Sequence, residues 1–157
     1  MGIGNGFRGD DSVGILVLDR VMENVRDLRE DQIIPVRLDG DQSIALDLMR
    51  SVEAVIIVDA ARSNVPAGTI FRIDAGDRPV PGGIKFSSTH GYDIGYLIEL
   101  ARALKTLPKH VIIYGIATNN FGHGSNLTAE VRESIDAVVM KILKDIELLQ
   151  KSWLSVH

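Results

Sequence analysis

The sequence contains no cysteine, no long apolar run and no excess of positive charge. The absence of cysteine excludes disulfide bonds, thiolate metal sites and a cysteine nucleophile. Any bound metal must therefore be held by oxygen and imidazole nitrogen. No apolar stretch approaches the roughly 18 residues that would span a bilayer, and no basic segment followed by an apolar one indicates a signal peptide. A net charge of −4 gives no reason to expect nucleic acid or a membrane as a partner.

The composition that remains is that of an ordinary globular protein. The 157 residues are 45% hydrophobic and 24% charged, which fits one folded domain over residues 1–157 with a proper core. Because cysteine is absent, we also expect a cytoplasmic protein.

Hydrophobic periodicity predicts helices that alternate with strands. Helical spacing covers residues 11–28, a short segment after Ser43, 93–104 and 128–149. Runs rich in β-branched residues predict strands at 33–38, 54–58, 69–73 and 111–116. This alternation indicates an α/β fold, a three-layer α/β/α sandwich. The link between strands 54–58 and 69–73 is too short for a helical crossover, so we expect these two strands to be antiparallel.

The N-terminal segment reads Gly-Ile-Gly-Asn, then an acidic pair at Asp10 and Asp11, then a helix. The glycines do not complete a G-x-G-x-x-G motif, because Phe7 stands where the third glycine would be. Asp10 is placed to cap the helix, whereas a second carboxylate exceeds what one cap needs. Asp11 is therefore the stronger functional candidate. The chain begins where a first strand should already have ended, so only a stub of that strand is expected.

Two further residues could share a site with Asp11. Asp59 directly follows the apolar run 54–58, and His90 lies among small residues that would let a ligand approach. In open α/β sheets, ligands collect at the carboxyl ends of the strands, where we expect these three side chains to meet. Each also has an ordinary interpretation, since Asp59 could be a turn acid and a lone loop histidine is usually surface.

Two carboxylates and one imidazole suit a divalent transition ion with open coordination positions. The same trio could instead act as general acid and base without metal. Sequence spacing does not separate these two hypotheses. His123, in the loop 119–125, lies on the same predicted edge but is more typical of loop surface. His110 and His157 are interpreted as structural and tail residues.

Several blocks, in order along the chain, resemble the hydrogenase maturation endopeptidases. These blocks are Gly2-Ile3-Gly4-Asn5, Asp10-Asp11 with Gly14, Val58-Asp59-Ala60, Pro66-Ala67-Gly68-Thr69, Ser88-Thr89-His90 and Gly115-Ile116. The resemblance implies a phosphorylase/hydrolase-like α/β/α fold whose mainly parallel, five-stranded sheet contains one antiparallel strand.

The resemblance also implies a function. Members of that family cut a C-terminal extension from the large subunit of nickel–iron hydrogenases after nickel insertion. The family's metal-binding positions correspond to Asp11, Asp59 and His90, which are also our candidate catalytic residues. The expected metal is nickel supplied by the substrate, with no organic cofactor, and the expected partner is the hydrogenase large-subunit precursor.

Three features depart from the family pattern. The first strand is almost missing, which predicts a start further upstream or a shortened chain. Thr118 stands where the family often has proline, and Ser12 replaces a common glycine. None of these changes touches the three predicted ligands.

Two other classes of function compete with the endopeptidase. A maturation factor could bind the metal-loaded precursor without cutting it, and retention of the three ligands fits this equally well. A nucleoside-phosphorylase-like enzyme of similar fold would need groups that bind phosphate. Arg8 and Arg62, both near the predicted edge, are too few to favour that reading.

Overall fold

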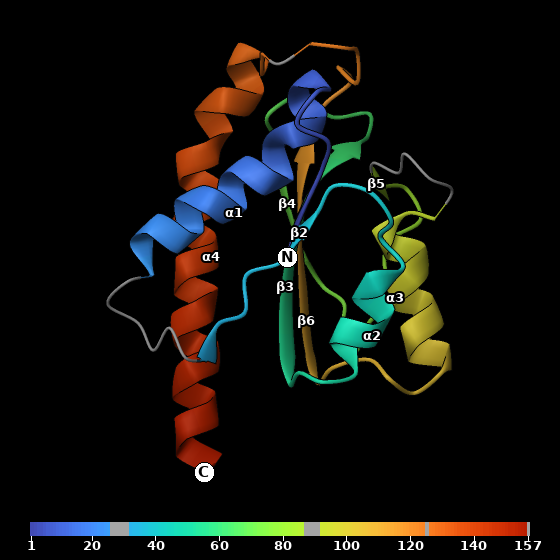
Figure 1. The fold of residues 1–157 in the computed structure, drawn as a ribbon, viewed down its shortest axis with the longest axis vertical. Helices are drawn as coiled ribbons and strands as arrows, with labels where there is room; N and C mark the ends of the chain where they lie inside the picture. Colours follow the sequence, from blue (N-terminus) through green and yellow to red (C-terminus); the bar gives the residue numbers. More distant parts are fainter. Residues whose placement is uncertain (26–31, 87–91, 125, 157) are drawn as a thin grey trace.

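In the computed structural model, one mixed sheet lies between helices on both of its faces (Figure 1). The structure describes residues 1–25, 32–86, 92–124 and 126–156. Its elements, in chain order, are β1 (Gly2–Ile3), the 3₁₀ helix η1 (Gly9–Ser12), α1 (Val13–Asn24), β2 (Arg37–Leu38), α2 (Ile44–Met49), β3 (Ala54–Arg62), β4 (Ile70–Asp74), β5 (Lys85–Phe86), α3 (Ile94–Ala103), β6 (His110–Ala117) and α4 (Ala129–Val156).

The sheet has the strand order β2-β1-β3-β6-β4, and β5 additionally pairs with β3. Strands β2, β1, β3 and β6 are parallel, whereas β4 is antiparallel to β6. The predicted sheet of five strands with one antiparallel member is thus confirmed. The short strand β5 is an addition, antiparallel to the last two residues of β3.

The two strands expected to be antiparallel do run in opposite directions, but they are not neighbours. No helix connects β3 to β4, as predicted, and β6 lies between them. Seven of the eight residues of β6 are buried. A strand of this kind is most stable with a neighbour on each side, so β6 takes the position next to β3.

The predicted strand at 33–38 is wrong over most of its length, because only Arg37 and Leu38 join the sheet. Pro35 lacks an N–H group and cannot donate to a ladder of hydrogen bonds. Ile34 is 69% exposed, so the apolar residues before the proline do not form a core-facing row.

The helices lie close to their predicted positions. The first begins as η1 and continues as α1, and residues 26–31 lie outside the described residues. Ser43 occupies the N-cap position of α2 without a side-chain capping bond, whereas Asp93 caps α3 by accepting from the Tyr96 N–H at 2.8 Å. Helix α4 continues past the predicted end to Val156.

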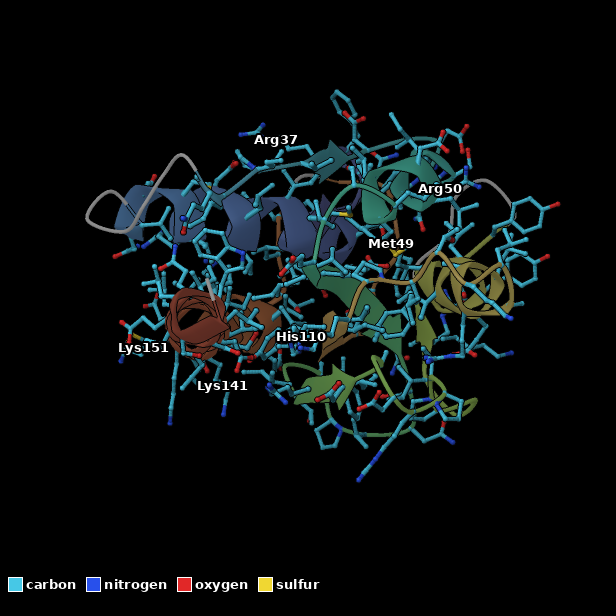
Figure 2. All side chains as sticks on the ribbon, turned by 90° about the horizontal axis from the view of Figure 1, so that it is seen from below. Arg37, Met49, Arg50, His110, Lys141 and Lys151 are labelled. Atoms are coloured by element: carbon cyan, nitrogen blue, oxygen red, sulfur yellow. The ribbon has the colours of Figure 1, made fainter. Side chains whose placement is uncertain are left out.

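Two clusters of buried side chains fill the space on either side of the sheet. Ile57 and Ile113 pack towards α2 and α3, whereas Val58 and Ile112 pack towards α1 and α4. Figure 2 views the molecule from the end at which β6 starts with His110, with α1 and α4 on one face and α2 and α3 on the other. None of the described helices is long and apolar enough to cross a membrane.

Candidate functional site

The glycines of the N-terminal segment allow α1 to start directly against the sheet. A Cβ atom on Gly14 would collide with the backbone carbonyl oxygens of Ile3 and Val58. A Cβ atom on Gly4 would likewise collide with the carbonyl oxygen of Asp11. These contacts involve backbone atoms that have no freedom to rotate away, so only glycine fits. The start of α1 is thereby held against the end of β1 and the middle of β3.

Asp11 lies in η1, whose four residues are all buried. Its backbone N–H donates to the Arg8 carbonyl at 2.9 Å, and its own carbonyl accepts from the Asn5 N–H at 3.1 Å. Asp11 is 2% exposed and lines a shallow hollow together with Ile3, Leu38 and other residues that follow β1 and β2. The hollow lies at the carboxyl ends of these two strands, where ligands bind in such sheets, but as the side chains stand it has no room for a water molecule.

Asp59 does not end its strand, as the sequence suggested, but lies within β3 opposite Gly115 of β6. It is 0% exposed. Strand β3 continues beyond Asp59 because β6 on one side and β5 on the other supply backbone partners as far as Arg62.

The carboxyl edge of the sheet is stepped at Asp59. Gly2 pairs with Val58, so Asp59 lies level with Ile3, the last residue of β1. Asp59 also shares its face of the strand with Ile57, which packs in the same cluster as Ile3 and Leu38. The step therefore brings Asp59 to the side of the sheet on which the hollow at Asp11 opens.

The structure thus places two of the three predicted site residues at one edge, as expected from the topology. His90 lies outside the described residues. Among the residues that the structure describes, no three carboxylate or histidine side chains are arranged to hold a metal ion. The complete ligand set therefore stays a prediction. Two buried carboxylates can bind a cation or serve as acid and base.

Asp10 does not cap its own helix, which corrects that interpretation. Neither η1 nor α1 has a side-chain capping bond. The Asp10 carboxylate is fully buried and accepts three hydrogen bonds, from Thr118 Oγ1 at 2.6 Å, Thr128 N at 2.7 Å and Thr128 Oγ1 at 2.9 Å. It joins η1 to the end of β6 and the start of α4.

Thr118 and Thr128 are therefore parts of the site's framework that the sequence did not reveal as such. Thr118 stood out only as a departure from the family pattern, and a proline there would supply neither its hydroxyl nor its N–H, which donates to Ala61 at 2.9 Å. Of the other histidines, His123 is exposed, His110 begins β6, and His157 lies outside the described residues.

The model of one protein family, hydrogenase maturation protease (HycI), matches residues 40–145. This match covers more than half of the chain and includes Asp59. The chain belongs to the hydrogenase maturation protease family. Asp11 lies outside the matched range, so its position in the site rests on the geometry of η1 and the hollow.

Similar proteins agree with this membership. The hydrogenase expression/formation protein HupD of Thiocapsa roseopersicina is 25% identical over 146 residues, which are 92% of this chain and 65% of that protein. The chain thus spans just under two thirds of the length of this curated relative.

Solved structures of hydrogenase maturation proteases share the fold. The hydrogenase maturating endopeptidase HybD of E. coli has a TM-score of 0.68 at 19% identity, over 93% of this chain and 89% of that one. The maturation protease HybD of Thermococcus kodakarensis has a TM-score of 0.65 at 19% identity, over 91% and 94%. At such low identity these likenesses establish the fold alone.

Proposed function

We propose that this protein is an endopeptidase that removes the C-terminal extension from the nickel-loaded large-subunit precursor of a nickel–iron (NiFe) hydrogenase. The observation that carries the proposal is the pair of buried carboxylates, Asp11 and Asp59, at the stepped edge of the sheet. Membership of the hydrogenase maturation protease family supports the same substrate and reaction.

Asp11, Asp59 and His90 recognise the nickel of the substrate in this proposal. Two carboxylate oxygens and one imidazole nitrogen suit a divalent transition ion and leave coordination positions for ligands of the hydrogenase itself. The nickel belongs to the precursor, and the proposed reaction uses no organic cofactor. Because the nickel-free precursor lacks this shared contact, it is left uncut.

The cleavage step is hydrolysis of one peptide bond. One of the two carboxylates accepts a proton from a water molecule whose oxygen adds to the carbonyl carbon of that bond. The carbon–nitrogen bond then breaks, and the proton passes to the departing amine. Burial of both carboxylates favours this chemistry, because exclusion of solvent strengthens their electrostatic interactions.

The first experiment incubates the protein with nickel-loaded and nickel-free precursor and determines the product masses by mass spectrometry. We expect loss of the extension from the loaded precursor only. Stable binding of loaded precursor without any cleavage would instead establish a non-catalytic maturation factor and overturn the proposal.

The second experiment compares Asp59→Asn with the control Asp136→Asn. Asparagine retains the shape of Asp59 and one oxygen but lacks the charge, so affinity for the loaded precursor and cleavage should both fall, with cleavage reduced at least about 100-fold. His90→Gln should behave like Asp59→Asn. Asp136 lies on α4 with its side chain 88% exposed, so its variant should behave like wild type.

Binding separates metal recognition from simple acid–base chemistry. If Asp59→Asn binds loaded precursor at wild-type strength and only fails to cut it, the carboxylate is an acid or base and does not recognise nickel. Circular dichroism of each variant verifies that the fold is retained.

A further inference from the structure

Two loops at the carboxyl edge of the sheet are joined into one wall. Arg8 forms a parallel bridge with Gly124, and the Gly124 N–H donates to the carbonyl of Phe7 at 3.2 Å. The Gly9 N–H donates in turn to the Gly124 carbonyl. The wall carries Phe7, whose side chain is 85% exposed, although aromatic side chains of this size are usually at least half buried.

Arg62, the last residue of β3, lies against the same wall. Its guanidinium carbon lies 4.5 Å from the centre of the Phe121 ring. An aromatic ring in this position attracts the positive charge of the guanidinium. The five N–H donors lie in its plane and stay available for a carboxylate, which Arg binds in a two-pronged geometry.

Lys85 of β5 is the cross-strand partner of Arg62 in the antiparallel register. Side chains paired in this way point to the same face of a sheet, and two like charges directly opposite each other are destabilising. Within the described part of the chain, no carboxylate forms an ion pair with Arg62, Lys85 or Arg8. Arg72, by contrast, is paired with Asp145.

These cations lie at the carboxyl end of the sheet, near the proposed site residues along the chain. Arg8 precedes Asp11 by three residues in the turn that leads into η1. Arg62 follows Asp59 by three residues on β3, so its side chain points to the opposite face of the strand, the face of Val58 and Phe121. A protein of net charge −4 thus places three cations without a described acidic partner at the edge of the sheet that also carries Asp11 and Asp59. An anion bound at Arg62 and Lys85 would relieve their repulsion.

We propose that Arg8, Arg62 and Lys85, together with Phe7 and Phe121, bind a segment of the precursor's C-terminal extension that carries a carboxylate beside an apolar side chain. We refer to these five residues as the cationic rim. The inference rests on the proposed function. The nickel lies in the body of the precursor, which Asp11 and Asp59 hold. The extension must therefore run from the cleaved bond over a neighbouring part of the same edge of the sheet. The cationic rim forms that part of the edge.

The test uses Arg62→Gln and Lys85→Gln, which remove charge but keep most of the side-chain length. Arg50→Gln is the matched control, because Arg50 is exposed at the end of α2, near the opposite edge where β3 begins (Figure 2). The measurements are kcat and KM for cleavage of the nickel-loaded precursor, and the affinity of each variant for the mature, nickel-loaded subunit without its extension.

We expect KM for the precursor to rise about tenfold in each rim variant, with kcat within about twofold of wild type. The affinity for the mature subunit should not change. Added salt should raise the wild-type KM more than that of the variants, because salt screens exposed charges. Lys85→Gln should not lower the melting temperature, since it removes a repulsive pair.

The most decisive test reverses the charge on both sides of the proposed contact. Arg62→Glu should cut the natural precursor poorly, and a precursor with one acidic residue of its extension changed to lysine should restore cleavage. Unchanged KM values in the rim variants would overturn the inference, as would an equal loss of affinity for the mature subunit. If the wild-type protein itself leaves the loaded precursor intact, the proposed function fails, and this result is distinct from a failure of the rim alone.

Discussion

At the scale of single residues, adjacent aspartates have different surroundings. Asp10 accepts three hydrogen bonds from Thr118 and Thr128, while Asp11 lines the hollow at the ends of β1 and β2. The tight 3₁₀ turn of η1 directs neighbouring side chains in different directions. One carboxylate thus fastens the turn to β6 and α4, and the other is presented at the edge of the sheet.

Thr118→Val should lower the free energy of unfolding by about 1–3 kcal/mol, because a buried carboxylate loses one of its donors. The substitution also removes the acceptor for the Asn120 N–H, which lies 3.0 Å from Thr118 Oγ1. Urea denaturation measures the change. As a control, Thr69→Val removes an exposed hydroxyl that donates to a backbone carbonyl and should cost about 1 kcal/mol or less. Equal costs for the two variants would contradict a special role for the Asp10 bonds.

At the scale of elements, the site depends on how closely α1 approaches the sheet. Gly14 faces the carbonyls of Ile3 and Val58, so the first turn of the helix touches both β1 and β3. This contact places η1, and with it Asp11, beside the step at which Asp59 lies. Helix α3 lies on the other face with an ordinary aspartate cap, and a Cβ atom on its Gly95 would meet only side-chain atoms.

Gly14→Ala should therefore destabilise the protein by about 1–3 kcal/mol or more, because the new methyl group meets backbone atoms that cannot move aside. Thermal unfolding followed by circular dichroism measures this effect. Gly6→Ala is the matched control in the same segment. No atom lies within 4 Å of a Cβ built on Gly6, so its melting temperature should be close to that of wild type. A stable Gly14→Ala variant would show that α1 can shift away from the sheet.

At the scale of the whole molecule, a partly buried ion pair joins α4 to the sheet. Asp145 of α4 accepts two hydrogen bonds from Arg72 of β4, at 2.9 and 3.0 Å, and one from the Tyr114 hydroxyl of β6 at 2.5 Å. Burial alone would raise the pKa of the Asp145 carboxyl, but the bonds from Arg72 and Tyr114 hold that pKa below its usual value of 3.8.

The lowered pKa predicts acid sensitivity of the whole fold. The carboxylate's contribution to stability is present above the usual pKa, because the unfolded chain binds the proton more readily, and it is lost as pH falls through the lower folded pKa. Asp145→Asn should cost about 1.5–3 kcal/mol at pH about 6, and its stability should approach that of wild type as the pH falls through the lowered pKa of Asp145.

Denaturant titrations at several pH values test this expectation. The Arg72 side chain is 43% exposed, so solvent screens part of the interaction. Asp19→Asn removes a more exposed pair with Arg37 and should cost less than about 1 kcal/mol. A constant difference between wild type and Asp145→Asn at all pH values would contradict the assigned pKa direction.

The sequence by itself determined the α/β class, most of the elements and the edge of the sheet at which Asp11 and Asp59 lie. Local patterns carry this information, since apolar periodicity, capping residues such as Asp93 and the short link after Asp59 depend only on near neighbours. The resemblance in separated blocks indicated the family, which the family match confirms.

Only the tertiary structure decided which distant residues are neighbours. Three features join segments that are far apart along the chain. Strand β6 lies between β3 and β4, Asp10 accepts hydrogen bonds from Thr118 and Thr128, and Arg62 pairs with Lys85. The periodicity of one segment does not show which other segment it packs against. Strand order depends on how all the elements together cover each other's buried faces. The same limit explains why Asp59 was placed after its strand, since the neighbours that extend β3 come from β5 and β6.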